Sequence, residues 1–148
     1  MSSSTMTQTR RQEWMGVLAR ARPAQLAALL PDLPAHDYLR APETGCVMVR
    51  GRIGGAGAPF NLGEMTVTRC ALKIDGGAVG HGYVQGRDKM HAMRAALVDA
   101  LMQGNDAGRI EAEVLAPLRA EQSGQRLARA ERAAATKVEF FTMVRGED

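Results

Sequence analysis

Hydrophobic positions near the N-terminus recur at the three- and four-residue spacing of one helix face. They are Trp14, Val17, Leu18 and Ala21. The pattern predicts a helix from Arg10 to about Ala21, capped by Thr9, whose hydroxyl can accept a hydrogen bond from an early N–H. Pro23 favours the first turn of a second short helix that ends near Leu30, because the N–H that proline lacks is not needed there. The chain is therefore expected to open with a helical pair.

The middle of the chain alternates apolar and polar residues, which is typical of strands with one face against a core. Strands are predicted over residues 36–41, 46–53, 65–74 and 78–85. We expect a turn at 43–45, a flexible connection at 54–58, and a tight hairpin at Asp75–Gly76, because glycine supplies the positive φ that such turns need. These segments predict an antiparallel meander of three or four strands.

The second half of the chain returns to helical periodicity, most clearly over residues 87–102. The apolar side of that helix is expected to hold Met90, Met93, Leu97, Ala100 and Leu101, and the residues expected to face elsewhere are His91, Arg94 and Asp99. A short helix is predicted over 107–115. Residues 118–137 form a weakly amphipathic helix that Ser123–Gly124 interrupts, and 138–144 read as extended and apolar.

A chain of 148 residues accommodates these elements in one domain. The predicted fold class is α+β, with an antiparallel sheet of three to four strands, an N-terminal helical pair and C-terminal helices. Residues 1–8 are expected to form a flexible N-terminus, residues 9–137 a single α+β domain, and residues 138–148 an extended C-terminal docking tail.

Charge and composition narrow the class of partner. A net charge of +3 and a pI near 9.2 favour anionic partners only mildly. The sequence has no basic stripe interleaved with aromatics, which argues against nucleic acid. It also has no apolar signal core and no run of roughly 18 apolar residues, so we expect a cytoplasmic protein without membrane contact. Cys46 and Cys70 are expected to be reduced, buried thiols.

The sequence contains no complete catalytic constellation. Serines occur only at positions 2–4 and 123, and neither GxSxG nor HExxH is present. His36, His81 and His91 could hold a metal only if the fold brought them together by chance. We therefore predict no catalytic residue and no metal site in this chain.

The strand-to-helix turn QGRDKMH is the strongest candidate for ligand contact. Its polar residues are Gln85, Arg87, Lys89, His91 and Arg94. Gly86 permits close approach, and the helix N-terminus adds unsatisfied N–H groups. Two interpretations stay open, because Asp88 can simply favour the first helical turn and the other side chains can be solvated or bind a partner chain.

Two further groups are candidates for binding. Arg50 and Arg52 can gather with Arg69 and Lys73 on one sheet face, which is either solvated or meets another subunit or a polyphosphate. The glycine-rich RIGGAGAPF between these strands lacks the GK[ST] of a phosphate loop and indicates a long hairpin connection. The candidates for docking on a partner are Trp14, Phe140, Phe141, Met143 and Arg145. The alternative for the tail is an edge strand of its own sheet.

Four blocks of sequence carry a resemblance to a known family. They are RQEWMGVLA at 11–19, RGRIGGAGAPFNLGEMTVTRCALKI at 50–74, HGYVQGRDKMHAMRAALVDALM at 81–102 and VEFFTMVRGED at 138–148. In order and spacing the chain resembles PhnG, a small subunit of the bacterial carbon–phosphorus lyase system. It departs from that pattern mainly in the first ten residues and in 104–133.

The resemblance implies an accessory or structural subunit in organic phosphonate catabolism. Its implied partners are PhnI, PhnH, PhnJ and PhnL, in a hetero-oligomer with two-fold symmetry. With PhnG, PhnH and PhnL, the PhnI-centred activity displaces adenine from ATP and attaches a phosphonate at ribose C1, giving a ribose 1-phosphonate 5-triphosphate. ATP is then a substrate of the complex, and this chain carries no cofactor of its own.

The resemblance also separates this chain from the lyase subunit. PhnJ cleaves the carbon–phosphorus bond with S-adenosylmethionine and an iron–sulfur cluster, whereas this sequence has no cysteine motif for a cluster. Within the complex, the chain either positions PhnI or lends residues of the 85–94 turn to the active site. The alternative to a subunit of a complex is a free-standing module that binds nucleotides or nucleic acid.

Overall fold

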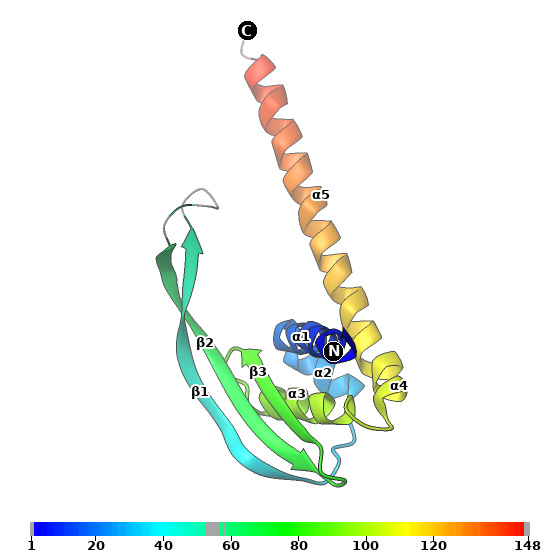
Figure 1. Cartoon of the computed structure of the whole chain (residues 1–148). Coiled ribbons are helices and arrows are strands. Elements are labelled where there is room, and N and C mark those ends of the chain that lie inside the picture. Colours follow the sequence, from blue (N-terminus) through cyan, green and yellow to red (C-terminus); the bar gives the residue numbers. More distant parts are fainter. Residues whose placement is uncertain (1, 53–56, 58, 147–148) are drawn as a thin grey trace.

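A three-stranded antiparallel sheet carries helices on one of its faces (Figure 1). The computed structural model describes residues 2–52, 57 and 59–146, without the side chains of 2, 3, 52, 59, 61 and 139–146. The elements are α1 (Ser2–Arg20), α2 (Pro23–Leu29), β1 (His36–Arg52), β2 (Pro59–Ile74), β3 (Val79–Gln85), α3 (Lys89–Leu101), α4 (Ala107–Ile110), the π-helical η2 (Glu111–Leu115) and α5 (Ala116–Gly146). The predicted α+β class is confirmed.

The sheet has the order β1-β2-β3 and includes the predicted hairpin. Gly76 and Gly77 both have φ +95°, and the Gly77 N–H donates to the Ile74 carbonyl at 3.1 Å. The predicted strands 36–41 and 46–53 are one strand in the structure, so the turn expected at 43–45 is wrong. Glu43 and Gly45 lie opposite Arg69 and Val67 of the long β2, so this backbone is paired as a strand. The pairing of β1 with β2 is irregular nearby, where the register shifts between positions 38 and 43. The connection expected at 54–58 lies, apart from residue 57, outside the described residues.

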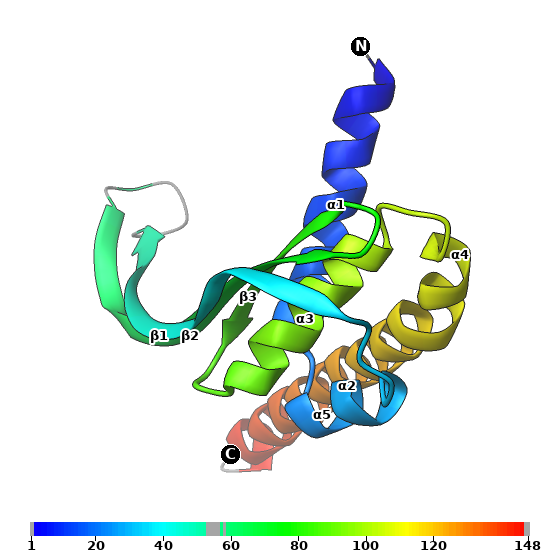
Figure 2. The same cartoon turned by 90° about the horizontal axis from the view of Figure 1, so that it is seen from below.

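Small residues let α3 lie close against the sheet. A Cβ atom on Gly80 would stand 1.9 Å from the Ala96 carbonyl oxygen, and one on Gly82 would stand 2.1 Å from that of Ala92. Because these glycines have no side chain, the backbones of β3 and α3 can approach. Figure 2 shows α3 running along the strands of the sheet.

The core lies between the sheet, α3 and the N-terminal helical pair. The predicted stripe of α1 is confirmed, because Trp14, Val17, Leu18 and Ala21 are all buried. Two expectations for α3 are corrected, since His91 and Asp99 are buried and Met90 is exposed. A helix with neighbours on several sides must bury more than one apolar stripe, and its polar residues then bond to those neighbours.

The N-terminal helix is longer than predicted, because it begins at Ser2 and not at Arg10. Thr9 is therefore no N-cap, and its hydroxyl donates to the Thr5 carbonyl one turn earlier at 3.0 Å. The sequence 2–8 has no proline or glycine, so nothing in it stops the helix. Helix α2 follows from Pro23, as expected.

Helix α5 is the largest departure from the prediction. It is continuous through Ser123–Gly124 and includes residues 138–146, which we expected to be extended. Alanine, arginine and glutamate dominate residues 116–137 and favour a helix strongly enough to carry it past one glycine. Figure 1 shows α5 leaving the body of the molecule, as does the far end of the β1–β2 pair. Every side chain from residue 123 to 138 is exposed.

Among the described residues, no helix combines the length and apolar character that crossing a membrane requires. The two cysteines differ in environment, because Cys70 is buried and Cys46 is exposed. The prediction of two buried thiols is thus half right. Burial raises the pKa of the Cys70 thiol to about 11, which makes that side chain unreactive.

Candidate functional site

The strand-to-helix turn is fixed by its own hydrogen bonds. Gly86 has φ +99°, its N–H donates to the Thr66 carbonyl at 2.9 Å, and its carbonyl accepts from the Thr68 hydroxyl at 2.8 Å. Asp88 is the N-cap of α3, because its Oδ1 accepts from the His91 N–H at 3.0 Å. The turn and its aspartate therefore have a structural role that holds without any ligand.

The five candidate residues of the turn do not converge on one point. Gln85, Arg87 and Lys89 are exposed, whereas Arg94 is half-buried and His91 is 1% exposed. The His91 ring donates from Nε2 to the Leu18 carbonyl at 2.9 Å, a bond that ties α3 to α1. Burial lowers the pKa of His91. This histidine is thus a neutral core residue, and the direct ligand role we considered for it is corrected.

The sequence analysis missed a buried carboxylate that joins three segments. Asp99 of α3 is fully buried and accepts from Arg11 Nε at 3.0 Å, Arg11 Nη2 at 2.7 Å, Trp14 Nε1 at 2.9 Å and the His81 backbone N–H at 2.8 Å. The hydrogen bonds to Asp99 raise the pKa of Arg11. An aspartate between apolar neighbours in ALVDALM was the available signal, because such a residue needs buried partners.

The same contacts settle the position of Trp14. Its side chain is 5% exposed and belongs to the core, so it does not form the docking surface that we predicted for it. The tryptophan ring instead fills space between α1 and α3, while its N–H helps to satisfy Asp99. A large aromatic with one polar atom suits this position, because the polar atom finds a buried acceptor.

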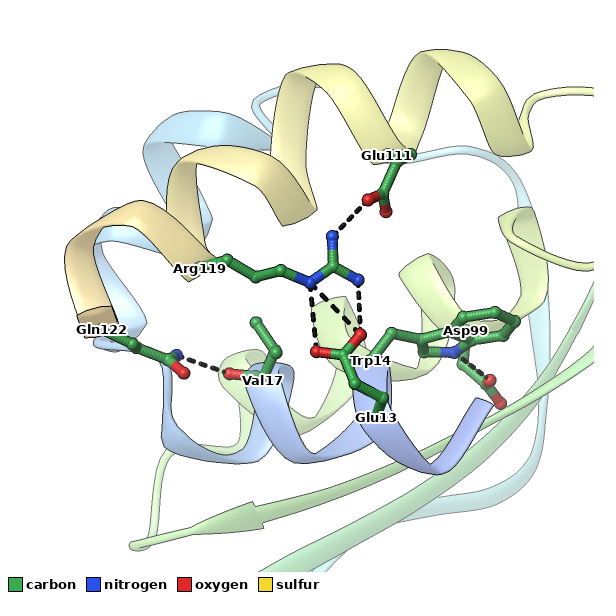
Figure 3. Close-up of polar contacts among 7 residues, drawn as sticks. All are labelled: Glu13, Trp14, Val17, Asp99, Glu111, Arg119 and Gln122. Carbon is green, nitrogen blue, oxygen red and sulfur yellow. Dashed lines mark hydrogen bonds and ion pairs between the residues drawn. The ribbon is translucent and has the colours of Figure 1, made fainter. Parts of the chain in front are cut away.

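An arginine holds the beginning of α5 against α1, as Figure 3 shows. The Arg119 guanidinium pairs with Glu13 of α1 and with Glu111 of η2. The hydrogen bond from Arg119 lowers the pKa of Glu13. One turn later, the Gln122 side-chain amide donates to the Val17 carbonyl at 2.9 Å. These contacts fix the direction in which α5 leaves the body.

The basic sheet face is less uniform than the sequence suggested. Arg69 lies opposite Glu43 and Lys73 lies opposite Asp37, so each cation has an acidic residue as its cross-strand neighbour. Arg50 lies opposite Asn61, eight residues earlier along β2 than Arg69, a separation on the order of 25 Å. The side chain of Arg52 lies outside the described residues. Arg50, Arg69 and Lys73 therefore do not form a single patch.

The remaining candidates for partner contact lie on the last turns of α5. The backbone of residues 139–146 is helical, but the side chains of Phe140, Phe141, Met143 and Arg145 lie outside the description. Their docking role stays a prediction, now for one helix and not for an extended tail. Among residues whose side chains are described, no three histidine, cysteine, aspartate or glutamate residues cluster as metal ligands.

The fold and the buried contacts first define the structural class of the protein. The chain is a small α+β protein whose buried polar groups hold its helices together, and whose long last helix projects beyond its core. Comparison with known proteins makes this specific. The family model described as "Phosphonate metabolism protein PhnG" matches residues 9–146. The chain belongs to the PhnG family.

A curated relative agrees with this assignment. The chain is 48% identical over 142 residues to the alpha-D-ribose 1-methylphosphonate 5-triphosphate synthase subunit PhnG of Rhizobium meliloti (strain 1021). The match covers 93% of this chain and 90% of that protein. The resemblance first seen in four sequence blocks is thereby confirmed.

Proposed function

We propose that this chain is an accessory subunit of a complex that synthesises ribose 1-phosphonate 5-triphosphates in organic phosphonate catabolism. The observation that carries the proposal is the 48% identity, across 93% of the chain, to a subunit named for that synthase. Identity spread over almost the whole chain includes its surface as well as its core. The partners that we infer are PhnI, PhnH, PhnJ and PhnL, in a cytoplasmic hetero-oligomer with two-fold symmetry.

The role that we assign to the chain is architectural. In the proposed reaction a phosphonate oxygen forms a bond to ribose C1 of ATP, and adenine leaves with the electron pair of its glycosidic bond. The buried histidine and the buried aspartate, His91 and Asp99, are occupied in holding α1 against α3. We therefore assign the chemistry to PhnI, and the iron–sulfur cluster and S-adenosylmethionine to PhnJ.

Two projecting elements support docking on a partner. On α5, Leu127 and Val138 are 62% and 64% exposed. The outer part of the β1–β2 pair exposes Met48, Phe60 and Leu62. Apolar groups that gather on elements beyond the core favour an interface over a solvated surface. We propose PhnI as the subunit that α5 contacts.

Co-purification tests this proposal. Tagged chain would be co-expressed with PhnI, PhnH and PhnJ, as the full length or without residues 130–148. The deletion should abolish capture of PhnI, while circular dichroism shows that the α+β body stays folded, because the side chains removed up to residue 138 are exposed. Met6→Ser, which alters an apolar residue of α1 that is 68% exposed, is the control and should leave capture intact. Normal assembly of the truncated chain would refute docking through α5.

Direct participation in the active site is the second candidate, favoured by the exposure of Arg87 and Lys89 at the start of α3. Arg87→Gln would then lower the activity of the assembled complex without changing its composition. A charge-assisted contact to phosphate contributes about 1.5–3 kcal/mol, so the loss in kcat/KM should be roughly tenfold or more. Full activity of the Arg87→Gln complex would mean that the turn has only a structural role. Loss of assembly would mean that the turn contacts another subunit.

A further inference from the structure

A small cleft lies where the end of α1, the end of β3 and the second to fourth turns of α5 meet. Its volume is about 260 Å³, and it is lined by Arg20, Gln85, Gln122, Gln125, Arg126 and Arg129. We call it the arginine–glutamine cleft. Only Gln85 of this set was among the residues that the sequence singled out. The others come from segments that the fold brings together, so their proximity was not visible in the sequence.

The wall formed by α5 is held in place. The hydrogen bond from Gln122 to the Val17 carbonyl, at 2.9 Å, anchors α5 on α1 (Figure 3). Positions 122, 125, 126 and 129 follow the three- and four-residue spacing of one helix side, so they face the cleft together. Gln85 comes from the opposite wall, where the hydrogen bonds of Gly86 fix the end of β3. The cleft is thus built on secondary structure that does not need a ligand for its shape.

The side chains that line the cleft carry positive charge. Its lining has three arginines and no carboxylate. Within the described ranges, none of the three arginines forms an ion pair, whereas nearby Glu121 pairs with Arg22 and Glu13 with Arg119. These two carboxylates form their ion pairs with other cations, although the charge of Glu13 also acts on Arg20. Gln122 and Gln125 already donate to the Val17 carbonyl and to Glu121, so the donors offered to an anion with several oxygens come mainly from the arginine forks.

Size and composition select the class of anion. The cleft is smaller than the pockets that enclose a drug-sized ligand, and its lining offers no aromatic ring on which a base could stack. We propose that the arginine–glutamine cleft binds the phosphate chain of a 5′-triphosphate, carried by either the nucleotide substrate or the ribose triphosphate product. This inference rests on the proposed function, since the name of the relative specifies a 5-triphosphate.

The full-length chain is tested first on its own, with inorganic tripolyphosphate, ATP and adenosine as probes in calorimetry at low salt. We expect tripolyphosphate and ATP to bind with similar affinity and adenosine not to bind, and the binding to weaken as salt is added. The double variant R126Q/R129Q should weaken tripolyphosphate binding at least tenfold. The matched control R132Q/K137Q removes the same charge from exposed positions further along α5, and should change affinity less than about twofold.

Several outcomes would overturn the inference. They are no binding of tripolyphosphate by the unaltered chain, equal losses in the two double variants, and adenosine binding as tightly as ATP. In the assembled complex, R126Q/R129Q should raise the KM for ATP while subunit composition stays the same. If that variant instead loses PhnI but binds tripolyphosphate normally, the cleft is a protein contact. The proposed function would then stand without this site. Failure of the unaltered chain to assemble would instead refute the proposed function, and tripolyphosphate binding would then show only an anion site without an assigned substrate.

Discussion

At the scale of single residues, the buried polar groups hold elements together that are distant in the sequence. Asp99 accepts four hydrogen bonds from α1 and β3, and His91 donates to the last turns of α1. Each polar group that is removed from water in this way needs its partners, because an unpaired one costs free energy of unfolding. The two residues therefore make specific predictions for stability.

Replacing Asp99 by asparagine should destabilise the fold without changing its shape. Asparagine keeps the size of the side chain but leaves the Arg11 guanidinium without its anion and turns an amide N–H₂ toward donors. Breaking a buried pair costs about 3–5 kcal/mol, and Arg11 is 36% exposed, so we expect about 2–3 kcal/mol in urea unfolding. Arg109→Gln, which breaks an exposed pair with Glu113, is the control and should cost less than about 0.5 kcal/mol. Equal losses would mean that Asp99 contributes no more than a surface charge.

His91 should make stability depend on pH below neutrality. Burial lowers its pKa from 6.5 in the folded chain, and a protonated ring would turn an Nδ1–H toward a site where, in the described structure, Nδ1 has no partner. The unfolded chain therefore takes up a proton first, and stability falls as pH drops below about 6.5, toward the lower folded pKa.

Urea unfolding of the unaltered chain and of His91→Gln between pH 7.5 and 5.5 checks this expectation. The variant should be less stable at pH 7.5, because it loses the packing of the ring, but its stability should change less with pH. His36→Gln, at the start of β1, is the comparison and should keep the slope of the unaltered chain. A slope that persists in His91→Gln would assign the pH dependence to other groups.

At the scale of elements, the packing of α3 on β3 depends on the absence of side chains. Gly82→Ala would place a Cβ atom 2.1 Å from a backbone oxygen of α3, so the helix would have to move away from the sheet. We expect a loss of about 3 kcal/mol or more, measured by thermal or urea unfolding. Gly45→Ala is the control, because its Cβ would have nothing within 4 Å, and it should change stability by less than about 0.5 kcal/mol. Equal stability of the two variants would contradict the close packing.

The helices and strands also show which parts of the fold could be predicted from the sequence. Periodicity predicted α3, Pro23 predicted the start of α2, and Asp75–Gly76 predicted the hairpin. These predictions hold because local preference and tertiary packing agree there. The turn at 43–45 was wrong because β2 supplies partners for that backbone, which local sequence does not reveal. The helical state of residues 138–146 was missed because aromatic and β-branched residues, which favour strands, are concentrated there. The helix that propagates from 116–137 decided the outcome.

The candidate site was predictable only in part. The QGRDKMH motif correctly indicated a strand-to-helix turn, but its polarity serves the cap of α3 and the bond from His91 to α1 as well as the surface. Asp99 and the arginines of the cleft depend on segments that meet only in the folded chain. A local motif can show which groups are present, whereas convergence is a property of the tertiary structure.

At the scale of the whole molecule, the chain by itself should lack the activity of its complex. Purified chain incubated with ATP and methylphosphonate should release no adenine above the rate without protein, followed by chromatography, because the described residues assemble no catalytic constellation. Addition of PhnI, PhnH and PhnL should restore release. Turnover by the isolated chain would contradict the accessory role and require a search for catalytic groups within it.

The bonds to Asp99 also have a consequence for synthesis on the ribosome. Arg11 and Trp14 precede their acceptor by 88 and 85 residues, so α1 emerges long before the helix that completes its buried contacts. At about 5–20 residues per second, this delay lasts roughly 4–17 s. During that time α1 carries an apolar stripe with no partner, which is the kind of surface that chaperones recognise. Docking of the first helix is therefore a late step in the co-translational folding of this protein. The intrinsic fluorescence of the Trp14 indole would report when this docking occurs.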